Sequence, residues 1–199
     1  MHISEGVLSG QVLLSGGILA GVGTAIGLKK MDYDRIAQVG ILSSAFFVAS
    51  LIHVNIGPSS VHLILNGIVG LLLGWMAFPA ILTALILQSL FFQFGGITAL
   101  GVNTVIMAVP AVICYFLFAP FIKRKGKIAT VSAFACGFLS VFLAAVLLAV
   151  ALVFTEESFL EIASLIITAN FPVMIIEGII TAFCIGFLQK VHPVLLGIK

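Results

Sequence analysis

Long apolar runs separated by short polar segments make up most of this 199-residue sequence. One of them, "IATVSAFACGFLSVFLAAVLLAVALVF", holds no charged residue and exceeds the roughly 20 residues that a helix needs to cross a bilayer core. It lacks the alternation over about 10 residues that is typical of a transmembrane β-strand. The pattern therefore predicts membrane-spanning helices.

The polar breaks between these runs predict seven helices. A first pass runs from about Gln11 to Leu28, and breaks at "HVNIGPSS", "WMAFP" and "FQFGG" divide the chain between Ile36 and Ile122 into four passes. Two more passes cover about 128–154 and 166–189. We expect an all-α integral membrane protein, a bundle of seven transmembrane helices that forms one domain over residues 1–199.

Composition supports this class. The chain is 62% hydrophobic and 8% charged, whereas soluble domains are about 45–50% apolar and about 25% charged. A net charge of +2 gives no reason to expect nucleic acid as a partner. The expected surroundings are a lipid bilayer.

The basic residues predict which way the bundle faces. All nine lie in three clusters, Lys29 to Arg35, Lys123 to Lys127, and Lys190 with Lys199. Basic residues favour the cytoplasmic side, so the amino terminus is expected outside, folded into the mouth of the bundle, and the carboxyl terminus inside. The predicted outer segments carry acidic residues and no Lys or Arg, which agrees with this orientation.

The opening residues "MHISEG" suggest a metal chelate. No signal-peptide pattern precedes the first apolar run, and a bulky second residue disfavours removal of Met1. The Met1 amine, the His2 amide nitrogen and His2 Nδ1 could bind one ion in fused five- and six-membered rings. Four nitrogens in a plane suit Ni(II) or Cu(II), whereas Zn(II) prefers a tetrahedron; Co(II) is the next candidate.

A second imidazole is needed to complete four nitrogens. His62, expected at the start of the third helix, is the preferred ligand and His53 the competitor, whereas His192 belongs to the cytoplasmic tail. Asn66, one helical turn beyond His62, could orient its ring. Glu5 could accept a hydrogen bond from His2 or neutralise the site, or have an ordinary capping role. Without a metal, His2 would be a disordered end and His62 a partner for a backbone carbonyl.

Several polar residues fall within apolar runs. Glu177, in "PVMIIEGIITAF", lies near the middle of the last helix and is expected to face the bundle interior with a partner, because an ionisable group at that depth is costly. Gln88, Gln93 and Asn103 are further buried polar candidates. They could form an interior hydrogen-bond network or line an ion path, and we prefer the network.

The sequence resembles the CbiM/NikM family, the cobalt- and nickel-binding membrane subunits of energy-coupling factor transporters. The resemblance rests on "MHISEG", on the stretch from "GPSSVHLILNG" to "VNTVIMAVPA" and on "FPVMIIEGIITAF". It implies a seven-helix substrate-binding subunit whose amino terminus and His62 form a near-planar metal site. "VIM" after Asn103 and Thr104 departs from relatives that carry a second polar residue there.

The resemblance also implies partners: two ATP-binding subunits, a transmembrane coupling subunit and in some systems a small accessory membrane protein. The chain itself holds no G-x-x-x-x-G-K-[ST] phosphate loop. We therefore expect no enzyme and no resident cofactor, but a transport subunit of a prokaryotic cytoplasmic membrane that captures Ni(II) or Co(II) for ATP-driven uptake. Alternatives are a cobalt-specific subunit linked to cobalamin synthesis, a facilitative metal channel and a membrane enzyme.

Overall fold

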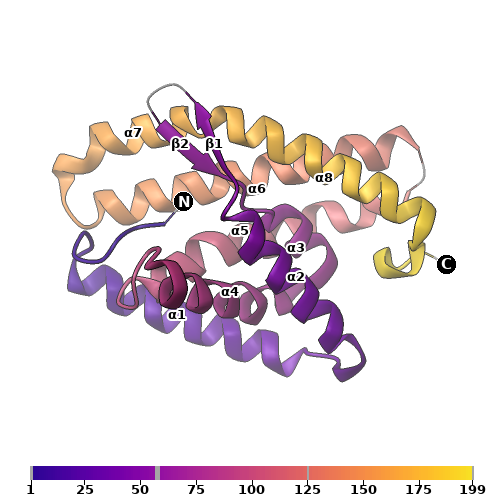
Figure 1. Cartoon of the computed structure of the whole chain (residues 1–199), viewed down its shortest axis with the longest axis horizontal. Helices are drawn as coiled ribbons and strands as arrows, with labels where there is room; N and C mark the ends of the chain where they lie inside the picture. Colours follow the sequence, from indigo (N-terminus) through magenta and orange to yellow (C-terminus); the bar gives the residue numbers. More distant parts are fainter. Residues whose placement is uncertain (1, 57–58, 125, 199) are drawn as a thin grey trace.

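The computed structural model describes residues 2–56, 59–124 and 126–198, with the side chains of residues 53–61, 157 and 163 excepted. Within these ranges the chain is helical apart from one antiparallel hairpin, and the helices run back and forth between two ends of the molecule (Figure 1). This confirms the predicted class, an all-helical membrane bundle.

The elements follow in this order: α1 Gly10–Lys29, α2 Ile36–Ala49, β1 His53–Ile56, β2 Ser59–His62, α3 Asn66–Leu73, α4 Ala77–Phe92, α5 Leu100–Ile122, α6 Lys127–Val153, α7 Leu160–Ala169 and α8 Phe171–Val191. In the hairpin, residue 53 pairs with residue 62 and residue 56 with residue 59. Short 3-10 turns lie at Tyr33–Arg35, Gly74–Met76, Glu157–Phe159 and Pro193–Leu196.

Five segments of the described chain are long and apolar enough to cross a membrane: Gly10–Lys29, Asn66–Phe92, Leu100–Ile122, Lys127–Val153 and Leu160–Val191. The 14 residues of α2 and the 8 of α3 are each shorter than the roughly 20 that a full crossing needs. The count of seven complete crossings stays a prediction.

The predicted breaks coincide with real interruptions of the helices. "HVNIGPSS" includes most of the hairpin, "WMAFP" falls on the turn Gly74–Met76, and "FQFGG" opens the loop between α4 and α5. The last helix differs from prediction, since helical structure begins at Leu160 and is interrupted at Asn170. Pro172 accounts for the interruption because proline cannot donate the backbone hydrogen bond that would continue α7 into α8.

Close approach of helix backbones holds the bundle together where glycine removes a side chain. A Cβ at Gly23 of α1 would overlap the ring of Phe78 in α4, and one at Gly70 of α3 would overlap the backbone of Ala111 in α5. Small residues at helix interfaces allow such packing in membranes, where apolar burial does not drive helices together. These contacts join α1 to α4 and α3 to α5.

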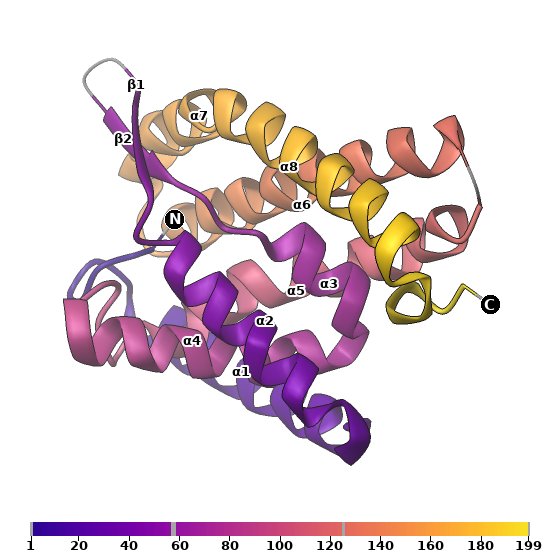
Figure 2. The ribbon, with the colours of Figure 1, turned by 45° about the vertical axis from the view of Figure 1, so that its right-hand side comes forward.

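The basic clusters gather at one end of the bundle. Arg35 donates from Nη2 to the carbonyl oxygen of Leu72 over 2.6 Å, and Gln189 donates from Nε2 to that of Ile122 over 2.7 Å. The segments around 30–35 and 123–127 and the carboxyl terminus share this end, while the amino-terminal segment, the hairpin and loop 93–99 lie toward the other (Figures 1 and 2). Which end faces the cytoplasm stays a prediction.

Candidate metal site

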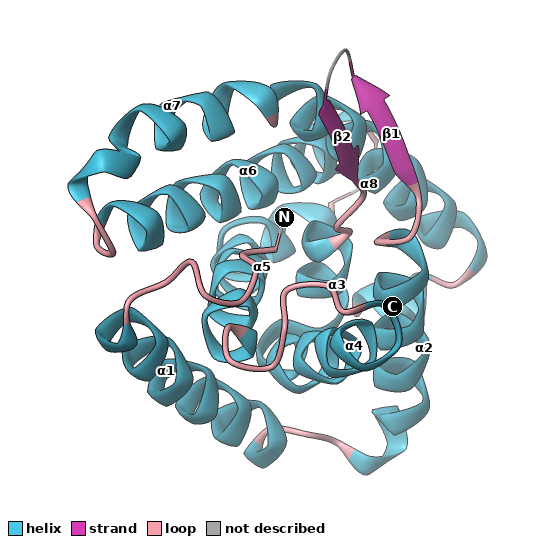
Figure 3. Cartoon of the chain, turned by 60° about the vertical axis from the view of Figure 1, so that its left-hand side comes forward, coloured by secondary structure: helices cyan, strands magenta, loops and turns pink. Residues whose placement is uncertain are grey.

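The amino-terminal segment folds back into the bundle mouth. Ile3 is 4% exposed, and its backbone is held at both hydrogen-bonding groups by one side chain of α5. Asn103 Oδ1 accepts from Ile3 N over 3.0 Å, and Asn103 Nδ2 donates to Ile3 O over 3.1 Å. Figure 3 shows this segment running inward from the start of α1 to the middle of the view. The buried amide of Asn103 therefore fixes the position of the residues that precede it.

The loop between α4 and α5 covers this segment. Glu5 Oε1 accepts from Ile97 N over 2.8 Å and from Thr98 N over 3.1 Å, so Glu5 holds the loop that precedes α5. Gly95 has φ +76°, and a Cβ built there would lie 2.6 Å from Asn103 Nδ2 and 3.5 Å from His2 Cβ. The glycine lets the loop close onto His2.

A directed chain of hydrogen bonds orients the His2 ring. The hydroxyl of Ser50 donates to Phe47 O over 2.7 Å, so its oxygen accepts from Gln88 Nε2, also at 2.7 Å. Gln88 then presents Oε1 to His2 Nε2 at 2.8 Å. A carbonyl oxygen can only accept, so Nε2 of His2 carries a proton, and in the neutral ring the lone pair is on Nδ1. This is the tautomer that the proposed chelate needs.

His62 approaches His2 from the hairpin. The two ring centroids are 5.0 Å apart with planes inclined at 30°, and the ring of Phe94 lies 6.1 Å from that of His2. His62 Nδ1 and the carbonyl oxygen of Leu63 are 2.9 Å apart. Because that oxygen accepts, Nδ1 of His62 carries a proton, and in the neutral ring the lone pair is on Nε2.

The expected placement of His62 in a helix was wrong. It is the last residue of β2, and α3 begins four positions later at Asn66. Backbone pairing with β1 holds this segment extended, so Asn66 is not one helical turn from His62. The Asn66 amide instead donates to Ser140 O in α6 over 3.3 Å. The carbonyl of Leu63 has the orienting role that we expected of Asn66.

Glu177 lies inside the bundle, as its depth in the last helix predicts. It is 0% exposed, and its Oε1 accepts from Ile64 N and, over 2.9 Å, from Leu65 N. The carboxyl group therefore holds the connection between β2 and α3.

Two of the proposed ligands fall outside what the structure describes. Met1 lies outside the described residues, and so does the side chain of His53. In the described part of the chain, no group of three or more His, Cys, Asp or Glu side chains could hold a metal ion.

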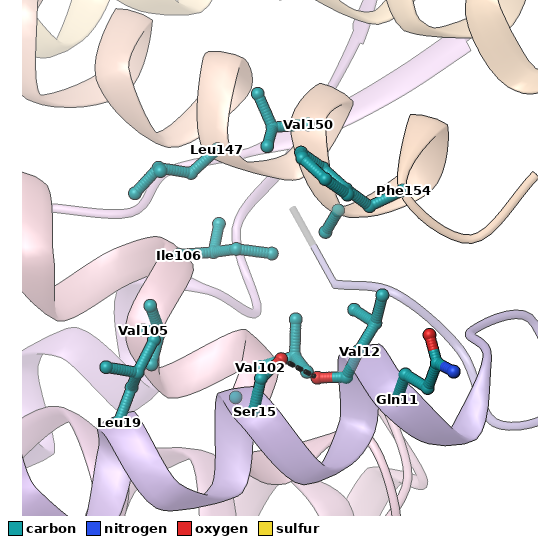
Figure 4. Close-up of a pocket in the computed structure, with 12 residues that line it drawn as sticks. Gln11, Val12, Ser15, Leu19, Val102, Val105, Ile106, Leu147, Val150 and Phe154 are labelled. Atoms are coloured by element: carbon teal, nitrogen blue, oxygen red, sulfur yellow. Dashed lines mark hydrogen bonds between the residues drawn. The ribbon is translucent and has the colours of Figure 1, made fainter. Parts of the chain in front are cut away.

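The clefts along the helices offer different chemistry. One cleft of about 370 Å³ between α1, α5 and α6 is lined mainly by aliphatic side chains (Figure 4). Its polar side chains are Gln11 and Ser15, and the Ser15 hydroxyl donates to Val12 O over 3.0 Å. A lining of this kind suits apolar molecules and supplies no ligand set for a transition metal.

Sequence reasoning missed the residues that surround His2. Gln88 was singled out as a buried polar residue but was not linked to His2, and Phe94 and Gly95 were treated only as part of a break between helices. The available signal was a glutamine inside an apolar run about one helical turn before "FQFGG". A polar side chain that close to a loop can face a site at the bundle mouth.

Comparison with known proteins identifies the family of the chain. The family model described as "Cobalt uptake substrate-specific transmembrane region", named CbiM, matches residues 2–195. A protein of Haemophilus influenzae whose name assigns it to metal transport is 42% identical over 97% of this chain and 95% of its own length. The fused nickel transport protein NikMN of Rhodobacter capsulatus is 38% identical over 55% of this chain and 33% of its own length.

A solved structure shares the fold. The crystal structure of a transition metal transporter aligns with a TM-score of 0.78 and 26% identity, over 99% of this chain and 97% of that one. The resemblance noted in the sequence is thereby confirmed: the chain belongs to the CbiM family of substrate-specific membrane components for cobalt and nickel uptake.

Proposed function

We propose that this chain captures Ni(II), with Co(II) as the alternative substrate, on the outer face of a prokaryotic cytoplasmic membrane. The ion would bind the Met1 amine, the His2 amide nitrogen, His2 Nδ1 and His62 Nε2. The family fixes cobalt and nickel as the class of substrate, and the preference for nickel is our own.

One observation carries the proposal: two facing imidazoles, 5.0 Å apart, with tautomers set by different partners. Gln88 leaves the lone pair of His2 on Nδ1, and Leu63 leaves that of His62 on Nε2. His2 Nδ1 is the ring nitrogen that can close a six-membered chelate ring with its own amide nitrogen. Metal-ligating histidines ordinarily have their other ring nitrogen held in this way.

Coordination chemistry favours nickel. An amine, a deprotonated amide and two imidazoles supply nitrogen donors, and tetragonal nitrogen sites suit Ni(II). Asn103 supports this set because it fixes Ile3, the first residue after the chelating nitrogens. The site would then be ordered before the ion arrives.

For transport we propose an energy-coupling factor arrangement, with two ATP-binding subunits and a transmembrane coupling subunit, and in some systems a small accessory membrane protein. The support is the family's assignment to cobalt uptake and the sequence of this chain, which holds no phosphate-loop motif. On this proposal the chain selects the ion, and its partners supply the energy.

The experiment is a Ni(II) titration of the purified chain with its native amino terminus, in detergent or nanodiscs, followed by competition with a chelator. Intact-mass spectrometry checks that Met1 is retained. Two Ala residues inserted before Met1, or His2→Ala, should abolish tight binding, because each destroys the fused chelate rings. A single inserted Ala would place the histidine third, where a free amine, two amides and the imidazole chelate Ni(II) again. A matched control carries the same two Ala residues after Lys199. Wild-type affinity in the extended protein would refute the terminal chelate.

A further inference from the structure

The buried carboxyl group of Glu177 reaches the metal site through one peptide unit. The peptide between Leu63 and Ile64 has its N–H directed at Glu177 Oε1 and its carbonyl oxygen at His62 Nδ1. A peptide unit is planar, so fixing the direction of its N–H also fixes the direction of its C=O. The side chain from α8 thereby determines where the acceptor for the His62 ring lies.

The backbone at this point needs such a partner. Leu65 has φ +55°, a left-handed conformation that is costly for a residue with a Cβ. Successive N–H groups around a left-handed residue form a concavity that accepts an anionic oxygen, and Glu177 Oε1 accepts from both Ile64 N and Leu65 N. Strained backbone that the surrounding structure holds in place is a recurrent feature of functional sites.

Polarisation of the 63–64 peptide strengthens the same contact with His62 that its geometry sets. A carboxyl oxygen that accepts from Ile64 N increases the partial negative charge on the carbonyl oxygen of the same peptide, since hydrogen bonds in series strengthen one another. Leu63 O then becomes a better acceptor for His62 Nδ1–H. An imidazole whose second nitrogen donates to a strong acceptor is a more basic metal ligand.

We propose that Glu177 is a positioning residue for His62, acting through the 63–64 peptide, and that it sets the affinity of the site for Ni(II) without contacting the ion. This inference rests on the proposed function, because it takes His62 as a ligand. It assigns Glu177 a task in substrate binding, which differs from both an interior network of purely structural value and an ion path.

The atoms involved allow a sharp set of variants. Only Oε1 makes the two hydrogen bonds, while Oε2 has no partner among the described residues. Glu177→Gln keeps a carbonyl oxygen for the two N–H groups and should retain function. Glu177→Leu removes the acceptor. Glu177→Asp keeps the carboxyl group but withdraws it by one methylene, and serves if the Leu variant fails to fold. Thr181→Val, one helical turn along α8 and also 0% exposed, is the matched control.

The measurements are Ni(II) affinity by chelator competition and the visible absorption of the bound ion, which differs between four and three nitrogen ligands. Glu177→Leu and Glu177→Asp should bind roughly tenfold or more weakly, as when other partners of metal ligands are removed. Their spectra should shift toward that of His62→Ala. Glu177→Gln should stay within about threefold of wild type, and Thr181→Val should match it.

Two results would overturn the inference: wild-type affinity and spectrum in Glu177→Leu and Glu177→Asp, or a Glu177→Gln variant as impaired as Glu177→Leu. Failure of the proposed function looks different. In that case His62→Ala itself would leave affinity and spectrum unchanged, whatever the Glu177 variants do.

Discussion

Replacing Gln88 by Leu tests the most direct link between the fold and the proposed metal site. Gln88 is 0% exposed, and its Oε1 is the acceptor for His2 Nε2. Leu has a similar volume but no acceptor. In the variant the His2 ring could adopt the other tautomer, with its proton on Nδ1, the nitrogen that must bind the ion. Forming the chelate would then require moving that proton and reorienting the ring.

The expected loss follows from how the hydrogen bond changes when metal binds. Before binding it joins neutral groups and contributes about 0.5–1.5 kcal/mol, whereas hydrogen bonds to charged groups contribute about 1.5–3 kcal/mol. A metal on Nδ1 draws charge from the ring and moves the bond toward the stronger class. The difference, about 1–1.5 kcal/mol, is close to the 1.4 kcal/mol that corresponds to a tenfold change in Kd. We therefore expect about tenfold weaker Ni(II) binding.

The assay is chelator competition on the purified chain, with thermal unfolding measured alongside to show that the bundle is intact. Gln11→Leu makes the same chemical change on α1, at the lateral cleft whose lining does not include His2, and should leave Kd unchanged. Gln88→Glu keeps an acceptor for His2 and should bind more tightly than Gln88→Leu. An unchanged Kd in Gln88→Leu would refute the reasoning that this amide sets the tautomer of His2.

Two further predictions concern the other imidazole and the covering loop. His62→Ala should weaken Ni(II) binding by more than the tenfold expected for Gln88→Leu, because it removes a ligand rather than a ligand's partner. His192→Ala, after the end of α8, should bind as wild type in the same titration. The reverse ranking would show that His62 is not the ligand. Gly95→Ala should weaken binding and lower the melting temperature, since its Cβ would lie 2.6 Å from Asn103 Nδ2. Gly126→Ala, with φ +78° and open space around its Cβ, carries the strain without the clash; equal effects on binding would contradict the packing explanation.

Local patterns were enough to predict the class of the fold and the positions at which its helices are interrupted. Uninterrupted apolar runs require helices in a membrane, because only internal hydrogen bonding satisfies the backbone there. The polar breaks marked the hairpin, the turn at Gly74–Met76 and the loop after α4, since each interrupts an apolar run. The lengths of the helices were harder to predict from the sequence. Helices α2 and α3 are short because a hairpin and a tight turn lie within the stretch assigned to full passes.

The histidine pair was also visible in the sequence, but its surroundings were not. His2 stood out through its place in "MHISEG", and His62 through the topology deduced from the basic clusters. Helical periodicity then suggested Asn66 as the partner of His62, which was wrong because strand pairing places His62 outside a helix. A spacing of four residues has meaning only where the backbone is helical.

Apolar runs, polar breaks and motifs were enough to predict a helical membrane protein of the CbiM family, the positions of its breaks and the two imidazoles to compare. How the site is held depends on tertiary contacts: Gln88 contacts His2, Asn103 holds Ile3, and Glu177 holds the turn after His62. These partners lie 86, 100 and 112 positions apart along the chain. Periodicity and motif spacing report on neighbours within a few residues, whereas hydrogen bonds between distant segments exist only once helix packing has brought the segments together.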